Sequence, residues 1–175
     1  PLRTITSFVQ LISSRYSKDI DDDGREWMVF IVEATKRMQS LIDDLLAYSQ
    51  AGAATIKKRP VDLNAVITWV KASLHTALES CSGEIVAHEL PRVQADETQM
   101  TQLFLNLIGN AIKYHSKENL NVEITASKNS GEWTISVKDN GIGIEPQYFE
   151  RIFLIFQRLH TRSEYPGTGM GLALC

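Results

Sequence analysis

The first fifty residues carry apolar side chains at alternating steps of four and three, the spacing of a helix that packs against other helices. The longest series is Trp27, Ile31, Ala34, Met38, Leu41, Leu45 and Tyr48. A shorter series, Ile5, Phe8 and Ile12, precedes it, and an aspartate-rich polar break runs from Lys18 to Gly24. The pattern predicts two antiparallel helices joined by a turn.

Two helices alone do not enclose such a stripe, because each needs apolar partners on more than one side. We therefore expect a homodimer in which two hairpins form a four-helix bundle. The alternative is that the hairpin packs on the rest of the chain as part of one core. Ala51-Gly52-Ala53-Ala54 and the polar stretch to Pro60 have the composition of a linker, which favours the first arrangement. We expect domains at 1–52 and 53–175.

Beyond this linker the pattern is one of helices mixed with strands. We expect helices at Leu63 to Glu79 and Glu97 to His115, a strand at Glu84 to Glu89, and paired strands at Asn121 to Lys128 and Trp133 to Lys138. The predicted fold class is α+β, a helical hairpin followed by an α/β sandwich with helices on one face of a mixed sheet. Trp27, Trp69 and Trp133 are expected in the core or in the helical seam.

Composition limits the function classes. The 175 residues are 43% hydrophobic, enough for one medium domain and a smaller element. No apolar run approaches the roughly 20 residues that span a bilayer, and Cys81 and Cys175 suit a reducing compartment, so we expect a cytoplasmic location. The net charge of −3 argues against a general nucleic-acid surface. Phosphate binding would need local positive charge, such as Lys113, Arg158 or Arg162.

The segment Asp139-Asn140-Gly141-Ile142-Gly143-Ile144 follows a strand-like run and has the chemistry of an adenine pocket. A carboxylate at a strand end accepts a hydrogen bond from an exocyclic amine, and Gly141 and Gly143 allow a tight turn beside a flat ring. The alternative is an ordinary Asp-Asn-Gly surface turn.

Two other segments supply what a nucleotide site still lacks. On the helix ending near His115, the apolar stripe leaves Asn106, Asn110 and Lys113 along one edge, at steps of four and three. Gly167-Thr168-Gly169-Met170-Gly171-Leu172 offers free amides for phosphate oxygens at a helix start. Taken singly, these segments also fit a structural asparagine and a flexible loop.

In order and spacing, the four segments closely resemble the N, G1, F and G2 boxes of sensor histidine kinases. The boxes correspond to Asn106 to Tyr114, Asp139 to Ile144, Phe153 to Phe156 and Gly167 to Leu172. The stretch from Phe156 through His160 to Gly167 resembles the form found in kinases with PAS or phytochrome-type sensors. The resemblance covers the chain from about Asp62 to Cys175.

The resemblance implies a Bergerat-type site for ATP and Mg2+. In that family Asp139 would bind the adenine amine, Asn110 would hold Mg2+ against the phosphates, and Asn106, Lys113 and Tyr114 would complete the nucleotide wall. Asn106, Lys113 and Arg158 would be the catalytic, electrostatic participants. The remaining nucleotide contacts would come from Gly141, Gly143, Gly167, Thr168, Gly169, Gly171 and Leu172. Residues 143–171 would form a lid, which we expect to be mobile.

The hairpin resembles the dimerisation and phosphotransfer element of the same family, with Pro1-Leu2-Arg3 matching the end of the box that carries the phosphorylated histidine. That histidine lies about five residues before the proline, and none of His75, His88, His115 and His160 is placed to replace it. We expect each of these four to be a structural or surface residue. Both ends are expected to be cut from a longer protein, because the sequence also stops inside the helix after the last box. This piece is therefore expected to be unable to phosphorylate itself.

The resemblance implies the core of a sensor histidine kinase, which moves the γ-phosphoryl group of ATP to a histidine and then to an aspartate of a response-regulator receiver domain. An upstream sensor domain is expected in the parent, and no nucleic-acid partner. The alternative is an ATP-binding, dimerising regulatory module without phosphotransfer of its own.

Overall fold

The computed structural model describes residues 1–53, 57–116, 119–161, 164–165 and 167–175. Backbone contacts divide the chain into two compact units, Pro1–Gln50 and Ala51–Cys175. Residues 54–56 of the expected linker lie outside the described residues. Within the described ranges, no helix is both long and apolar enough to cross a membrane.

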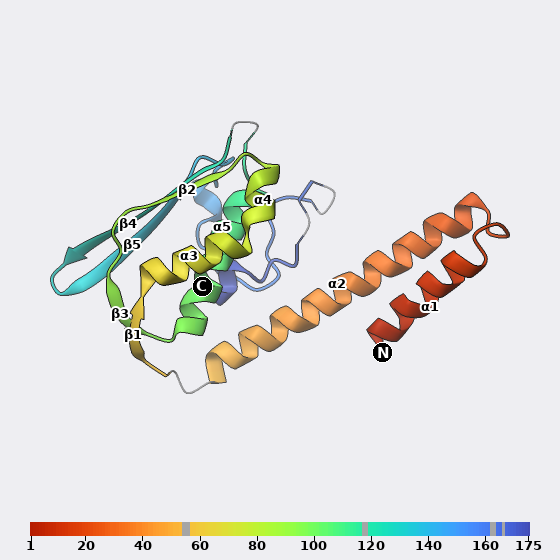
Figure 1. Ribbon diagram of the computed structural model, residues 1–175, viewed down its shortest axis with the longest axis horizontal. Coiled ribbons are helices and arrows are strands. Elements are labelled where there is room, and N and C mark those ends of the chain that lie inside the picture. Colours follow the sequence, from red (N-terminus) through yellow and green to blue (C-terminus); the bar gives the residue numbers. More distant parts are fainter. Residues whose placement is uncertain (54–56, 117–118, 162–163, 166) are drawn as a thin grey trace. The chain divides into compact units, whose positions relative to one another are not determined.

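The first unit is the expected antiparallel helical hairpin, made of α1 (Leu2–Arg15) and α2 (Asp22–Ala53) (Figure 1). The aspartate-rich break forms the turn. The Asp21 carboxylate accepts the N–H of Gly24 at 2.8 Å, and Arg25 donates to Asp22 at 2.8 Å and to the Ser17 carbonyl at 3.1 Å. Acidic side chains at the start of α2 satisfy its free amides and favour its dipole.

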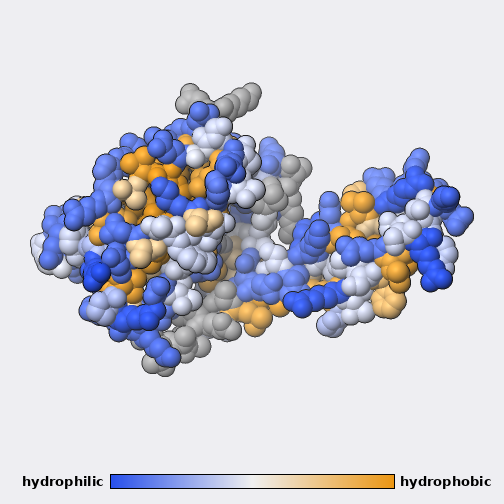
Figure 2. Space-filling model, in the orientation of Figure 1, coloured by the Kyte–Doolittle hydropathy of each residue, from blue (hydrophilic) through white to orange (hydrophobic). Residues whose placement is uncertain are grey.

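The hairpin has almost no interior of its own. Thr35, 3% exposed, is the buried residue among those described in this unit. Apolar side chains of the predicted seam lie at the surface instead, with Trp27 63% and Leu45 50% exposed. Phe8 of α1 is 60% exposed, and Figure 2 shows hydrophobic surface along both helices. One hairpin alone leaves its apolar stripe in water.

The second unit is built on a mixed sheet of three strands, in the order β2-β4-β5. Strand β2 (Glu84–Ala87) runs parallel to β4 (Asn121–Asn129), and β4 runs antiparallel to β5 (Glu132–Asp139). The β4–β5 turn is two residues, Ser130 and Gly131, both with positive φ, as tight hairpins require. The mixed sheet and its hairpin are thus confirmed.

A second, two-stranded antiparallel sheet was not predicted as a pair. It joins β1 (Arg59–Asp62) to β3 (Arg92–Ala95), with Arg59 opposite Ala95 and Asp62 opposite Arg92. Each strand is four residues long, too short for the alternation of polar and apolar residues to be distinctive.

Helices α3 (Leu63–Ser73), α4 (His75–Ser80) and α5 (Glu97–Lys113) lie against one face of the sheet (Figure 1). The single helix expected from Leu63 to Glu79 is therefore two helices, which break at Leu74. Backbone hydrogen bonding still crosses the break, from Leu74 N–H to the Val70 carbonyl at 3.0 Å and from Leu78 N–H to the Leu74 carbonyl at 2.9 Å. The apolar spacing continues, so the pattern does not reveal the break.

The core lies between these helices and the sheet. Its most completely buried side chains are Leu63, Ile67, Val70, Phe104, Ile108, Leu120, Val122, Ile124 and Met170. Trp69 and Trp133 are not among them, being 55% and 42% exposed, so their expected place in the core was wrong. On α3, Val66, Ile67 and Val70 take the buried side, which leaves Trp69 outward.

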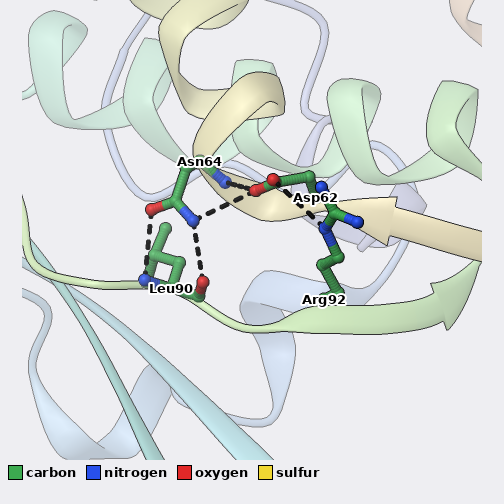
Figure 3. A network of polar contacts seen from close by, with 4 residues as sticks. All are labelled: Asp62, Asn64, Leu90 and Arg92. Atoms are coloured by element: carbon green, nitrogen blue, oxygen red, sulfur yellow. Dashed lines mark hydrogen bonds and ion pairs between the residues drawn. The ribbon is translucent and has the colours of Figure 1, made fainter.

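A polar network fixes the start of α3 to the loop before β3 (Figure 3). The Asn64 side chain donates to the Leu90 carbonyl at 2.7 Å and accepts the Leu90 N–H at 3.1 Å, as a neighbouring strand would. Asp62 accepts the Asn64 N–H at 3.0 Å and Arg92 Nε at 3.4 Å. This network holds the β1–β3 sheet to α3.

Candidate nucleotide-binding site

The polar edge of α5 is held in place by the burial of its other face. Asp96 caps the helix by accepting the N–H groups of Thr98 and Gln99 at 3.0 and 3.3 Å. Asn106 and Asn110 are half-buried on the edge predicted from their spacing. Asn106 Oδ1 accepts Gln102 Nε2 at 3.2 Å, whereas its Nδ2 is buried without a hydrogen-bond partner among the described residues. A buried donor of this kind has an unmet need for an acceptor.

The Asp139 segment forms a tight loop that is tied to the end of α5. One Asp139 carboxylate oxygen accepts the Gly141 N–H at 2.8 Å, and the Ile142 N–H donates to the Tyr114 carbonyl at 3.0 Å. A Cβ at Gly141 would lie 2.6 Å from that carbonyl oxygen, so only glycine fits. Asn140 fastens the loop to the sheet by accepting the Asn121 N–H at 2.8 Å.

The glycine-rich segment lies against the same helix. Met170 is fully buried, and Gly171 stands close to Asn106, whose side-chain oxygen would be 3.8 Å from a Cβ there. Gly167 has φ of 151° and Gly169 has φ of 79°, values that favour glycine. A Cβ at Gly167 would lie 2.5 Å from Lys113 Nζ. The segment continues into the short 3-10 turn η3 (Leu172–Leu174), with Thr168 half-buried before it.

The structure thus gathers most of the predicted nucleotide residues around the C-terminal end of α5. Tyr114 is the junction, because its carbonyl holds the Asp139 loop and its ring lies 4.5 Å from Lys113 Nζ. Gly143, with φ of 73°, leads from that loop into the lid.

Two aromatic residues at this junction were missed. The Tyr114 ring stands 5.8 Å from His160 and 4.9 Å from Tyr165, and those two rings are 5.1 Å apart between centroids. His160 was rated a structural or surface histidine from the sequence, and Tyr165 was not singled out. Both residues lie within the predicted lid, so their position in the sequence could have indicated that they are near the nucleotide site.

Arg158 faces its own loop. Its Nη2 donates to the Tyr165 carbonyl at 2.5 Å and to the Thr161 carbonyl at 3.4 Å. The turn is completed by Glu164, which accepts the Thr161 hydroxyl at 2.8 Å and the Thr161 N–H at 3.0 Å. These hydrogen bonds lower the pKa of the Glu164 carboxyl. Arg162 lies outside the described residues.

The first part of the predicted lid contains two short 3-10 turns, η1 (Pro146–Tyr148) and η2 (Arg151–Phe153). It places large apolar side chains at the surface, namely Phe149, Phe153, Leu154, Ile155 and Phe156. The mobility of this lid stays a prediction.

The residues at this site fit a nucleotide with Mg2+. Asp139 keeps a second carboxylate oxygen for an amine, a Cβ at Gly143 would have nothing within 4 Å, and Asn106 Nδ2 is buried without a partner among the described residues. Over the described part of the chain, no group of three or more His, Cys, Asp or Glu residues forms a metal site. An amide oxygen of Asn110 together with phosphate oxygens suits Mg2+, which keeps several of its waters.

Comparison with known proteins finds relatives among ATPases and sensor kinases. Residues 95–175 match the family of histidine kinase-, DNA gyrase B- and HSP90-like ATPases. Cyanobacterial phytochrome A of Nostoc sp. is 45% identical over 100% of this chain and 23% of its own length. Phytochrome-like protein Cph1 of Synechocystis sp. is 42% identical over the same shares. The structure of full-length ShkA in complex with AMPPNP is similar with a TM-score of 0.71 and 28% identity, over 99% of this chain and 36% of that one.

The fold and these matches place the second unit among the ATPases of that class. Within the class, it is the ATPase domain of a sensor histidine kinase. The chain spans 23% of the length of the two phytochrome relatives.

Proposed function

We propose that this chain is the catalytic core of a sensor histidine kinase that binds ATP and Mg2+ in residues 53–175. In the parent protein the γ-phosphoryl group would pass to a histidine on the hairpin of residues 1–52, and then to an aspartate of a response regulator. The observation that carries the proposal is the junction at Tyr114, where the Asp139 loop and the end of α5 are hydrogen-bonded together. The glycine-rich segment reaches the same helix at Lys113.

Each residue at the junction has a role that follows from its chemistry. Asp139 would accept the adenine amine, with Gly141 and Gly143 allowing the ring to approach. Asn110 would hold Mg2+, which supplies charge neutralisation at the phosphates when bound. Asn106 and Lys113 would donate to phosphate oxygens, beside the amides of Gly167, Thr168, Gly169, Gly171 and Leu172. Tyr114 would complete the wall.

Homodimerisation through the hairpin is part of the proposal. Its support is the exposed apolar stripe of α2, of which Met38 is 45% and Leu45 50% exposed. A sensor domain before the hairpin, a receiver domain as partner and a cytoplasmic location are the corresponding expectations for the parent. The match of this whole chain to cyanobacterial phytochrome A and phytochrome-like protein Cph1 supports an upstream sensor domain of the PAS or phytochrome type in the parent. A regulatory module that binds ATP and dimerises without phosphotransfer of its own is the second candidate.

Calorimetric titration of the chain with ADP and Mg2+ tests the nucleotide site. Asp139→Asn replaces an acceptor by an amide whose donor end repels the adenine amine, so affinity should fall about tenfold to a hundredfold. The matched control is Glu132→Gln, which removes a carboxylate at the other end of β5 and should leave affinity unchanged. If Asp139→Asn and the wild type bound ADP with equal affinity, the assignment of Asp139 to the adenine amine would be wrong.

The same titration with and without Mg2+ tests Asn110. Asn110→Ala should weaken ADP binding mainly when Mg2+ is present, because the lost amide oxygen is a metal ligand. An equal loss under both conditions would make Asn110 a structural residue.

A further inference from the structure

We propose that Arg158 is a positioning residue, which fixes the glycine-rich segment against α5 before any nucleotide arrives, and that His160 and Tyr165 act with it. The proposal rests on the proposed nucleotide site and changes the electrostatic role that the sequence predicts for Arg158. It also gives a role to His160, which the sequence left as a structural or surface residue.

The guanidinium group of Arg158 is already committed to protein atoms. Its Nη2 donates to backbone carbonyls three and seven residues further on, those of Thr161 and Tyr165. Its Nε is buried without a hydrogen-bond partner among the described residues. A guanidinium is a rigid fork of donors, so carbonyls bound to it are held at a fixed spacing. Nη2 is therefore already bonded to the loop in the nucleotide-free chain.

Tyr165 is held at two points. Its carbonyl is bonded to Arg158, and its ring packs against Tyr114 at 4.9 Å and His160 at 5.1 Å between centroids. Tilted aromatic pairs at these distances are attractive. Because Tyr114 caps the end of α5, the ring cluster links the lid to the helix that carries Asn106, Asn110 and Lys113.

The glycine-rich segment starts two residues after Tyr165 and rests on Arg158 itself. A Cβ at Gly169 would lie 2.7 Å from the Gln157 carbonyl oxygen and 3.0 Å from Arg158 Cγ. The aliphatic part of the Arg158 side chain therefore packs against the loop, and its guanidinium group holds the Thr161 and Tyr165 carbonyls at a fixed separation. Lys113, whose Nζ lies beside Gly167 and over the Tyr114 ring, is the cation that this arrangement presents to the phosphates.

Hydrogen exchange of the nucleotide-free chain tests this role without a ligand. Arg158→Ala should speed exchange of the Tyr165 and Leu174 amides, which donate to the Thr161 and Met170 carbonyls on either side of the glycine-rich segment, about tenfold or more, because hydrogen bonds from a charged group to this loop are lost. Exchange in the buried strand β4 should stay unchanged, which shows that the domain remains folded. The matched control is Arg151→Ala, an arginine of the lid that contacts the Gln157 side chain at 3.4 Å, and it should not alter exchange at the Tyr165 and Leu174 amides. Unchanged exchange in Arg158→Ala overturns the proposal, whether or not the chain binds nucleotide.

Substitutions in the cluster of the Tyr114, His160 and Tyr165 rings test the proposal independently of Arg158. Tyr165→Ala keeps the backbone carbonyl and removes the ring, and it should speed exchange as Arg158→Ala does. Tyr165→Phe keeps the ring and should restore wild-type exchange. Slow exchange in Tyr165→Ala would remove the ring cluster from the proposal.

Nucleotide affinity separates positioning from phosphate binding. Arg158→Ala should weaken ATP and ADP binding by the same factor, about tenfold, and Arg158→Lys should behave similarly, because lysine lacks the rigid planar fork of donors that fixes the spacing of the two carbonyls. A loss of ATP affinity more than tenfold larger than that of ADP, largely restored by Arg158→Lys, would show a γ-phosphate ligand and overturn the proposal. Failure of the wild-type chain to bind either nucleotide would refute the proposed function, while the exchange result would still decide the role of Arg158.

Discussion

At the scale of single residues, aspartates at the ends of strands set the geometry of the next segment of chain. Asp62 and Asp96 stand at the ends of short strands and cap α3 and α5, each accepting a backbone N–H at 3.0 Å. Asp139 ends β5 and closes the loop to Gly141 in the same manner. The shared cause is that a short carboxylate reaches amides two or three residues ahead. After Asp139 the chain continues as a loop and not as a helix.

Asp62 should make the stability of the second unit depend on pH. Hydrogen bonds from Asn64, first its side chain and then its backbone, lower the pKa of the Asp62 carboxyl, with a smaller contribution from Arg92. A folded-state pKa below the unfolded value, about 4, stabilises the fold above that pH, and the stabilisation is lost as pH falls through the folded pKa. The unfolding free energy of wild type should therefore exceed that of Asp62→Asn at pH 6, and the gap should narrow by pH 3.

Urea unfolding at both pH values measures this gap. Glu89→Gln, which changes an exposed carboxyl on the loop before β3, is the control for general charge effects. A gap between wild type and Asp62→Asn that widens towards pH 3 would contradict the cap.

At the scale of elements, the site depends on two segments that lie against one helix with little space between them. The Asp139 loop approaches α5 so closely that a Cβ at Gly141 would stand 2.6 Å from the Tyr114 carbonyl oxygen and 2.7 Å from Asp139 Oδ1. Gly109, inside α5 itself, has nothing within 4 Å of a Cβ. The same residue type is thus required at one position and replaceable at the other.

Gly141→Ala and Gly109→Ala should therefore change the unfolding free energy in opposite directions. Gly141→Ala should displace the Asp139 loop, lower the unfolding free energy and weaken ADP binding about tenfold or more, because backbone atoms block the new methyl group. Gly109→Ala should raise the unfolding free energy by about 0.5 to 1 kcal/mol, the gain of alanine over glycine in a helix. Urea unfolding and ADP calorimetry on both variants measure this. Similar changes in the two variants would contradict the close packing at Gly141.

At the scale of the whole molecule, the two units differ in how they exclude water. Residues 51–175 contain a contiguous buried core around Phe104, Ile108 and Val122, whereas the hairpin buries only Thr35 among its described residues. Since burial of apolar surface is the main favourable term in folding, we propose that a second copy of the chain covers the apolar stripe of the hairpin.

The hairpin should make the chain dimeric. Light scattering should give a dimer for wild type and a monomer or aggregates for the double variant Leu41→Glu, Leu45→Glu, which would bury charges without partners. The matched control places the same two charges at exposed polar positions of α2, Ser40→Glu with Ser49→Glu, and should stay dimeric. A wild-type chain that is monomeric at high concentration would refute the bundle.

Binding and phosphotransfer should be separable in this chain. The hairpin contains no histidine, and the four histidines present, at 75, 88, 115 and 160, lie in the second unit. His88 is bonded to Glu123 at 3.1 Å and His115 to the Ile112 carbonyl at 2.6 Å. Incubation with γ-labelled ATP should therefore leave no acid-labile phosphate on the chain. A label mapped to any of the four would identify an acceptor that we have excluded.

Periodicity in the sequence determined the elements of this protein. The steps of four and three along α2 predicted a helix, and the runs that form β4 and β5 predicted strands. Such patterns are visible in the sequence because an element that buries one face carries apolar residues at the period of its own geometry. The glycine and asparagine motifs likewise located the site, because few residue types satisfy a tight turn or a phosphate-binding backbone. The strands β1 and β3 are too short to show such a pattern.

The tertiary structure alone decided which distant segments meet and which way their side chains point. The contact of Tyr165 and His160 with Tyr114 joins residues about fifty positions apart, and the outward position of Trp69 follows from which side of α3 faces the sheet. The charge of Arg158 is typical of a phosphate ligand. In the structure, however, its guanidinium group donates to backbone carbonyls of its own loop. The physical reason is that a side chain's partners are set by the packing of whole elements, which no short stretch of sequence encodes.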